Sequence, residues 1–232
     1  MIVTEEDKWD RAKIGRSTDF GKTWMFNNDD FNNLSWDFSE PGGAFAAACF
    51  LQFGKDYQGA RDNFVYGYSE RIRPYVIQPD IVMFRVPKDQ IMHRSAYEFF
   101  AYLDANGSPQ WTSDINQMKP VFSDPNGVSW GVQAVYHPVL RRYLLTVQRN
   151  DTSAWGIFDA PEPWGPWTTV AYYDNWIDST FKFLFAFNQK WMSDNGKTMY
   201  MVFSGVGMYD SFNVIKAALT VKTPKRPSSY MR

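Results

Sequence analysis

The sequence predicts an all-β fold made of short antiparallel strands. Aromatic residues make up 18% of the 232 residues, and aromatic side chains favour strands. Short apolar runs separated by turn residues recur along the whole sequence, and no segment shows the periodicity of an amphipathic helix. Because none of these runs alternates with a helix, the pattern favours a sandwich, barrel or propeller over an α/β fold.

The apolar runs justify this class element by element. Each alternates or is continuously apolar over a few residues and is bounded by turn residues, as strands of a buried sheet are. The strands expected in chain order are residues 44–53, 63–68, 81–86, 97–103, 131–136, 143–147, 154–158, 168–173, 181–187, 199–203 and 214–221.

A repeated layout selects a propeller among the all-β classes. Three times an apolar strand leads to a polar turn and then to an aromatic-rich strand, centred on Tyr66, Tyr143 and Tyr200, which are 77 and 57 residues apart. Common propeller repeats span about 40–50 residues, so long loops are expected. Radial repetition of four-stranded sheets limits exposed edges. We therefore expect antiparallel blades at approximately 41–112, 121–175 and 178–222.

Three blades are too few to close a ring comfortably. The first clear element is the turn at 17–24, with little room before it for two inner strands. We therefore expect residues 1–232 to form a single incomplete propeller domain that lacks N-terminal blades and keeps an outer fragment at 17–27.

Composition argues against several classes of partner. The chain carries 24 basic and 25 acidic residues in no blocks, which gives no reason to expect nucleic acid. No apolar stretch approaches the roughly 20 residues of a membrane span. The acidic start lacks an apolar run, so we expect any signal peptide to lie outside this sequence.

No cofactor is expected, with a structural calcium ion as an open alternative. The sequence has neither a phosphate-binding loop nor a nucleophile elbow. His93 and His137 are isolated and lack metal-ligand spacing. His137, beside Pro138 in a turn, is expected at the surface. The single cysteine, Cys49, lies in an apolar run and is expected to be buried and inert.

Residues 17–24 read Ser-x-Asp-x-Gly-x-Thr-Trp, which resembles the Asp-box of sialidases and related propellers. We expect Asp19 to accept hydrogen bonds from its own turn, Gly21 to take a positive φ, and Trp24 to pack between sheets. A weaker copy at 193–199 has methionine in place of the tryptophan. The Asp-box is a marker of the fold, so its aspartate is expected to be structural.

A longer resemblance covers about residues 45–221. The segments Asp-Ile-Val-Met-Phe-Arg-Val-Pro-Lys-Asp-Gln-Ile at 80–91, Tyr-Glu-Phe-Phe at 97–100, Arg-Tyr-Leu-Leu at 142–145 and Asp-Ala-Pro-Glu-Pro-Trp-Gly-Pro-Trp at 159–167 are similar to bacterial propeller proteins long known only as a domain of unknown function. Some members of that group are glycoside hydrolases acting on arabinan. The resemblance implies a five-bladed ring and binding of or action on a glycan. We also expect an extracellular or periplasmic location.

Strand direction predicts where a site lies. If strands alternate in direction, the start of each inner strand and the loop between the second and third strands of each blade emerge on one face. The residues expected on that face are Glu70, Arg71, Arg73, Tyr75 and Asp80 from the first blade, Trp130, Gln133, Arg149, Asn150 and Asp151 from the second, and Asp178, Lys182, Tyr209 and Asp210 from the third.

Carboxylates, cations and aromatic rings at one polar mouth suit glycoside hydrolysis. One carboxylic acid protonates the leaving oxygen, and a second carboxylate acts as base or nucleophile. The candidate catalytic residues are Glu70, Asp80, Asp151 and Asp210. The candidate substrate-binding residues are Arg73, Trp130, Gln133, Arg149, Lys182 and Tyr209. Glu162, in the Pro/Trp turn, is expected to be structural or solvated, and Asp62 is expected on the opposite face, away from the site.

The sequence thus predicts a secreted glycoside hydrolase that degrades a polysaccharide. The alternative among enzymes is a sialidase, which needs a tyrosine nucleophile and an arginine cluster. Its candidate arginines are Arg71, Arg73, Arg85 and Arg149. The alternatives from other classes are a non-catalytic glycan-binding propeller and a protein-interaction scaffold.

Overall fold

The structure is a computed structural model that describes residues 1–4, 8–27, 36–54, 57–149, 151–174, 176–177 and 182–221. Regular structure in these residues is β, apart from three-residue 3₁₀ segments such as η2 (Arg94–Ala96), η3 (Ile115–Gln117) and η4 (Gln189–Trp191). Within the described ranges, no helix has the length and apolar character to cross a membrane. The predicted all-β class is confirmed.

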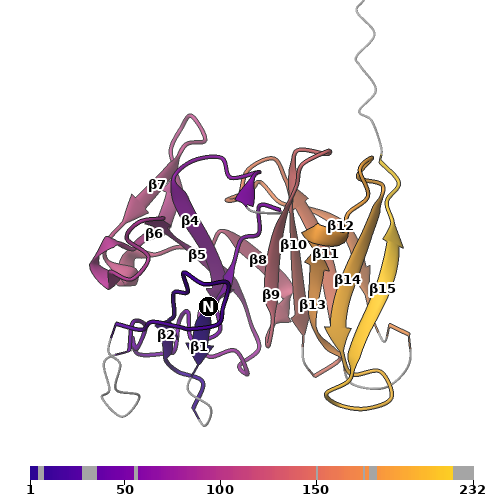
Figure 1. The fold of residues 1–232 in the computed structure, drawn as a ribbon, viewed down its shortest axis with the longest axis horizontal. Coiled ribbons are helices and arrows are strands. Elements are labelled where there is room, and N and C mark those ends of the chain that lie inside the picture. Colours follow the sequence, from indigo (N-terminus) through magenta and orange to yellow (C-terminus); the bar gives the residue numbers. More distant parts are fainter. Residues whose placement is uncertain are drawn as a thin grey trace, which may run out of the picture.

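The first half of the chain forms the largest sheet, on the left in Figure 1. Neighbouring strands are antiparallel, and they follow chain order except for the last, which returns to pair with the start of the third. The strands are β3 (Cys49–Phe50), β4 (Phe64–Glu70), β5 (Gln78–Pro87), β6 (Glu98–Leu103), β7 (Pro109–Thr112) and β8 (Phe122–Val128).

The second half forms two smaller antiparallel sheets in chain order. The middle sheet contains β9 (Val132–His137), β10 (Arg142–Arg149), β11 (Ala154–Ala160) and β12 (Thr168–Tyr173). The third sheet contains β13 (Phe183–Asn188), β14 (Thr198–Ser204) and β15 (Phe212–Ala218). The middle sheet is thus four-stranded, whereas in the described residues the first sheet has six strands and the third has three.

The sheets pack side by side around their first strands, which gives a propeller-like arrangement. Strand β10 shows why: its run Tyr-Leu-Leu-Thr-Val is apolar on both faces. Leu145 belongs to the core shared with the first sheet, and Leu144 belongs to the core shared with the third. At the centre, Gln52 bridges to Val135 of β9, and β9 lies beside β13.

Three strand regions escaped prediction. A hairpin of β1 (Ile2–Thr4) and β2 (Ala12–Ile14) precedes residues 17–24, so the expectation that the regular structure begins with that turn is wrong. These strands are too short to give an apolar run, and β7 has only four residues. Strand β8 contains proline, asparagine and glycine, which normally indicate a turn. It remains in the sheet through an irregular register with β5.

The turn at 17–24 has the internal bonds that the Asp-box pattern predicts. Asp19 accepts hydrogen bonds from the backbone N–H of Thr23 at 2.9 Å and from its hydroxyl at 2.7 Å, and these bonds lower the pKa of the aspartate. Gly21 has φ +84°. Trp24 is 40% exposed, and its indole N–H donates to the carbonyl of Gly21 at 3.1 Å. The expected packing of Trp24 between sheets is therefore wrong.

His137, expected at the surface, is buried at the end of β9. Its Nδ1 accepts a hydrogen bond from the N–H of Leu140 at 3.2 Å. Nε2 therefore carries the proton and donates to the carbonyl of Gly196 at 2.8 Å. The β9–β10 turn thus folds the ring inward against the β13–β14 turn. Burial lowers the pKa of His137, which favours the neutral ring that these bonds require.

Gly67 lies at a close approach inside the first sheet. It pairs with Phe84 across β4 and β5, and a Cβ added to Gly67 would lie 2.2 Å from the Phe84 ring. Phe84 cannot give way easily, because its ring centroid lies 5.3 Å from that of Phe45 and 5.1 Å from that of Tyr97. The glycine is therefore required by packing and not by a turn.

We predict that Gly67→Ala destabilises the protein by about 3 kcal/mol, near the upper end for overpacked cores. Chemical denaturation measures the change. The control is Gly107→Ala in an exposed turn, where the new methyl group meets open space and only the positive φ costs about 1 kcal/mol. Equal effects of the two substitutions would show that Phe84 does not constrain Gly67.

Candidate functional site

A cavity of about 330 Å³ lies where the ends of the three sheets meet, and we call it the mouth cavity. It takes its lining from the N-terminal segment, the β4–β5 loop, the starts of β9 and β13, and the β14–β15 connection, which turns at the lower end of Figure 1. Four of the expected site residues line it: Trp130, Gln133, Tyr209 and Asp210.

Aromatic rings form much of the mouth cavity. The rings of Trp9 and Trp130 meet edge to face with centroids 4.9 Å apart, and Tyr75 packs against Trp130 at 6.4 Å. Across the cavity, Tyr209 packs on Phe183 at 5.1 Å. Such rings offer flat apolar surfaces next to hydrogen-bonding groups. Trp9 was missed by the sequence reasoning, because it lies in a charged segment with no strand signal.

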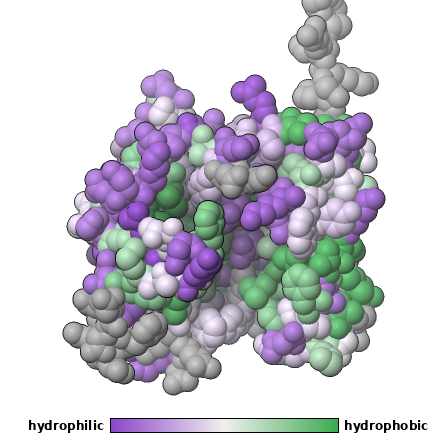
Figure 2. All heavy atoms as spheres, viewed as in Figure 1, coloured by the Kyte–Doolittle hydropathy of each residue, from purple (hydrophilic) through white to green (hydrophobic). Residues whose placement is uncertain are grey.

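The rim of the mouth cavity is apolar on one side. The β14–β15 connection and the start of β15 expose Met208, Tyr209 and Phe212. Figure 2 shows hydrophobic side chains gathered at the lower right, over these elements, whereas much of the rest of this face is hydrophilic. A ligand in the cavity would therefore meet apolar surface along this edge.

Glu70 lies directly behind the cavity wall. It ends β4, is 1% exposed, and its Oε1 accepts a hydrogen bond from the N–H of Gly131, a wall residue, at 2.8 Å. Its Oε2 is buried without a hydrogen-bond partner. Desolvation raises the pKa of Glu70 to about 7, although the backbone N–H groups lower it. A carboxyl group with this pKa holds and releases a proton near neutral pH.

Gln148 is a second buried polar group at the same wall. It is 2% exposed, its Oε1 accepts a hydrogen bond from the N–H of Leu184 at 2.5 Å, and its Nε2 has no partner. A Cβ on Gly131 would lie 3.1 Å from Gln148 Oε1. Glu70 and Gln148 thus bring an unsatisfied acceptor and an unsatisfied donor close to Gly131. The sequence analysis missed Gln148, although a polar residue at the end of an apolar strand was a signal that could have indicated it.

Asp80, Arg149 and Asp151 lie outside the mouth cavity. Asp80 and Arg149 line an open groove beside β8, where the Ser123 hydroxyl donates to Asp80 at 2.6 Å. Arg149 donates to both carboxylate oxygens of Asp151, at 2.7 and 2.9 Å. These hydrogen bonds lower the pKa of Asp151, so this carboxylate is held in its charged form.

The remaining expected residues are dispersed. Arg73 pairs with Asp10 at 3.3 Å and lines a separate pocket. Lys182 is fully buried at the start of β13, and its N–H donates to Ser153 Oγ at 3.3 Å. Two further expected residues, Asn150 and Asp178, lie outside the described residues.

The four candidate arginines of a sialidase do not form one cluster. They make ion pairs with four different carboxylates: Arg71 with Asp80, Arg73 with Asp10, Arg85 with Glu98, and Arg149 with Asp151.

Two acidic residues that the sequence analysis excluded from the site make local contacts. Asp62 accepts a hydrogen bond from the Tyr66 hydroxyl at 2.7 Å. Glu162 forms an ion pair with Arg61, whose guanidinium lies 4.7 Å from the ring centroid of Trp164. These contacts tie the β3–β4 segment to the Pro/Trp turn.

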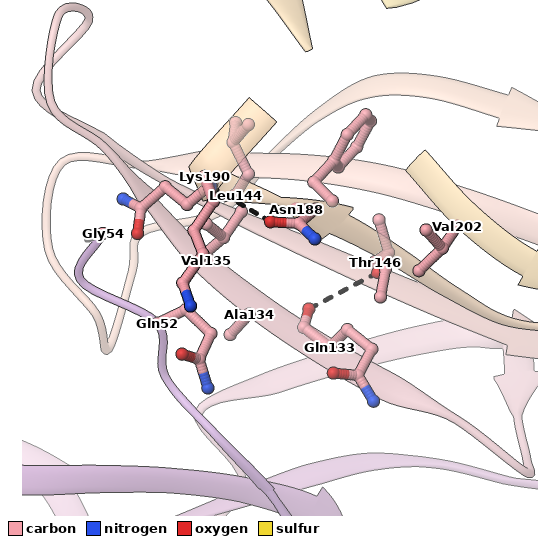
Figure 3. Close-up of a pocket in the computed structure, with 13 residues that line it drawn as sticks. Gln52, Gly54, Gln133, Ala134, Val135, Leu144, Thr146, Asn188, Lys190 and Val202 are labelled. Atoms are coloured by element: carbon pink, nitrogen blue, oxygen red, sulfur yellow. Dashed lines mark hydrogen bonds between the residues drawn. The ribbon is translucent and has the colours of Figure 1, made fainter. Parts of the chain in front are cut away.

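A separate cavity of about 240 Å³ lies between β9 and β13. Figure 3 shows the amide side chains of Gln52, Gln133 and Asn188 around it, with Thr146 on its wall. Gln133 lines this cavity and the mouth cavity. No carboxylate is among its described lining residues, so it offers hydrogen bonds without an acid–base pair.

The described ranges show no candidate metal-binding site. They contain no group of three or more His, Cys, Asp or Glu side chains placed to hold a metal ion.

Comparison with known protein families identifies the family of the chain. The model of the family described as "Domain of unknown function (DUF4185)" matches residues 3–214. A search of curated proteins finds no match.

Glu70 generates a pH-dependent prediction. Its pKa is about 7 when folded against an ordinary value of 4.5, so the folded state holds a proton that the unfolded state releases between these pH values. The contribution of Glu70 to the free energy of unfolding is therefore fully present below pH 4.5 and is lost as the pH rises through about 7. We expect Glu70→Gln to become progressively more stable than the wild type from pH 4.5 to 8 in thermal melts.

The control for this measurement is Asp210→Asn, which removes an exposed carboxylate from the same cavity. If Glu70→Gln and the wild type keep a constant difference in melting temperature over this pH range, Glu70 is not a desolvated acid.

Proposed function

The chain belongs to the DUF4185 family, and we propose that it is a carbohydrate-active protein, a glycoside hydrolase that binds a polysaccharide at the mouth cavity. Polysaccharides of this kind lie outside the cytoplasm, so we also propose an extracellular or periplasmic location. Arabinan is the first substrate to test, because some members of the group that the sequence resembles act on it.

The single observation that carries the proposal is the environment of Glu70. Glycoside hydrolysis needs one carboxylic acid that is protonated near neutral pH and a second carboxylate that is ionised. Burial raises the pKa of Glu70 to about 7, which suits a general acid. Asp210 lines the same cavity and is exposed to water, which suits a base or nucleophile.

The other residues of the cavity have matching roles in this proposal. Trp9, Trp130 and Tyr209 would stack on the apolar faces of sugar rings, and Gln133 would bind hydroxyl groups. Gly131 separates Glu70 from the cavity and has no side chain to block it. Asp151, held by two hydrogen bonds from Arg149, is a weaker candidate for acid–base catalysis.

A non-catalytic glycan-binding role is the second candidate. It is favoured by the enclosure of Glu70 Oε2, which is buried without a partner and would need the cavity wall to shift before it could meet a glycosidic oxygen. The dispersed arginine ion pairs count against a sialidase.

We predict that Glu70→Gln and Asp210→Asn each lower the turnover of soluble arabinan by about 10²–10⁴-fold, the usual contribution of general acid–base catalysis. Release of reducing ends measures turnover. Asp151→Asn serves as the control and should cost less than about tenfold, since this residue lies outside the mouth cavity. Full activity of Glu70→Gln would exclude it as the acid.

We predict that Trp130→Ala weakens arabinan binding by about tenfold, because one stacking or edge contact is worth about 0.5–1.5 kcal/mol beyond its buried area. Isothermal titration measures the affinity of the folded variant. Binding without turnover in the wild type would support the non-catalytic role, and unchanged binding by Trp130→Ala would place the glycan elsewhere.

A further inference from the structure

Another cavity, of about 480 Å³, is lined by residues of β8, β11 and β12, and we call it the β8 pocket. Aromatic side chains form one part of its wall and the turn within β8 forms the other. Its described lining residues are Phe122, Ser123, Asp124, Pro125, Asn126, Phe158, Trp167, Thr169 and Tyr172. It adjoins the open groove of Asp80 and Arg149, with which it shares residues 123, 125 and 126.

We propose that the β8 pocket is a second sugar-binding site, which takes a neutral sugar residue of a polysaccharide. This inference takes the class of ligand, a polysaccharide, from the proposed function. The residues that line the β8 pocket are different from those that line the mouth cavity.

The carboxylate of Asp124 points to a missing donor. Asp124 is 3% exposed, and its Oδ1 accepts hydrogen bonds from both the N–H and the side-chain amide of Asn126, each at 2.9 Å. Its Oδ2 is buried with no partner. A buried acceptor without a donor is destabilising, more so when it is charged. Since Oδ2 is buried, a shift of the pocket wall would let a ligand hydroxyl group donate to it and remove that cost.

The turn itself does not require this burial. Asp114 and Asn116 make the same two hydrogen bonds at 3.0 Å each, but Asp114 is exposed to water. The same pair of hydrogen bonds thus occurs at the start of η3 and within β8, and of the two aspartates Asp124 is the one that is buried and lines a cavity. The neighbouring Asn126 accounts for the hydrogen bonds to Oδ1 of Asp124, but nothing in the local structure accounts for the burial of Oδ2 without a partner.

The aromatic part of the wall is suited to a sugar ring. The rings of Phe122 and Phe158 pack with centroids 4.5 Å apart, and Trp167 meets Phe122 edge to face at 6.4 Å. Trp167 and Tyr172 are half-buried, so part of each ring remains available. Flat apolar surface beside hydrogen-bonding groups matches a molecule that carries C–H faces and hydroxyl groups.

Hydrogen-bonding capacity favours a sugar over a cation. Aromatic rings with a carboxylate also bind ammonium groups, but an ammonium group offers donors alone. Hydroxyl groups, in contrast, both donate and accept, and this wall offers partners of both kinds.

The pocket lies close to the mouth cavity along the chain. Asn126 precedes Trp130 by four residues, so their Cα atoms are at most about 14 Å apart. One polysaccharide chain would therefore be able to contact both sites, which suits a long substrate more than a short one.

The test replaces one atom. Asp124→Asn keeps an oxygen for the two Asn126 bonds and turns the unpartnered acceptor into a donor. We expect it to weaken binding of soluble arabinan by about tenfold or more, since a hydrogen bond to a charged group is worth about 1.5–3 kcal/mol. Asp114→Asn is the matched control and should bind as the wild type does. Tyr172→Ala is the second variant, and thermal melts check that each protein is folded.

Comparison with Trp130→Ala separates the two sites. Weaker binding by Asp124→Asn and Tyr172→Ala, in addition to the loss at the mouth cavity, supports the second site. If only Trp130→Ala weakens binding, the β8 pocket is not a sugar site and the proposed function stands. If only the β8 variants do, the mouth proposal fails and the β8 pocket stands. Absence of binding to arabinan, xylan and galactan, or preferential binding of tetramethylammonium at the β8 pocket, overturns the inference.

Discussion

The packing of the middle sheet against both neighbours is the constraint on which the rest of this structure depends. Strand β10 is buried on its two faces, with Leu145 in one core and Leu144 in the other. Each face of the strand packs into a different close-packed core, and this packing on both sides holds the strand in place. The bond from His137 to Gly196 at 2.8 Å then joins the turns of two sheets. Once the sheets are aligned, their loops must gather at common ends.

The mouth cavity follows from that alignment. Strands that alternate in direction return the β4–β5 and β14–β15 connections to the end where β9 and β13 begin. The resulting wall contains both aromatic rings and Gly131, behind which Glu70 and Gln148 are buried. Glu70 differs from the other acidic residues near this end because it is buried and one of its carboxylate oxygens has no hydrogen-bond partner. Asp80 and Asp151, in contrast, accept hydrogen bonds from neighbouring side chains.

Much of the fold could be predicted from the sequence, because buried strands carry their own signal. The run at 168–173 coincides with β12, and most other runs match strands within a few residues. The run at 44–53 is the exception, since only Cys49–Phe50 form a strand there and residues 44–47 form turns. Strand β8 could not be predicted, since Pro125 and Gly127 normally indicate a turn and its pairing with β5 is a tertiary effect. The position of Trp24 was misjudged for a similar reason: its indole bonds to its own turn instead of to a neighbouring sheet.

The candidate site was less predictable than the fold. Alternation of strands predicted which loops share an end, and Trp130, Gln133, Tyr209 and Asp210 do line one cavity. Sequence spacing could not tell a buried carboxyl group from one paired with an arginine, which is the difference between Glu70 and Asp151. It also gave no signal for Trp9, which reaches the cavity only through the N-terminal segment.

The most direct test of this account is the titration of the Glu70 carboxyl carbon by NMR in the intact protein. The account predicts a midpoint near pH 7 that shifts when a glycan fills the mouth cavity, because the ligand changes the surroundings of the buried group. A midpoint near the ordinary glutamate value of about 4.3 would contradict the account, since Glu70 would then be an ordinary ionised carboxylate.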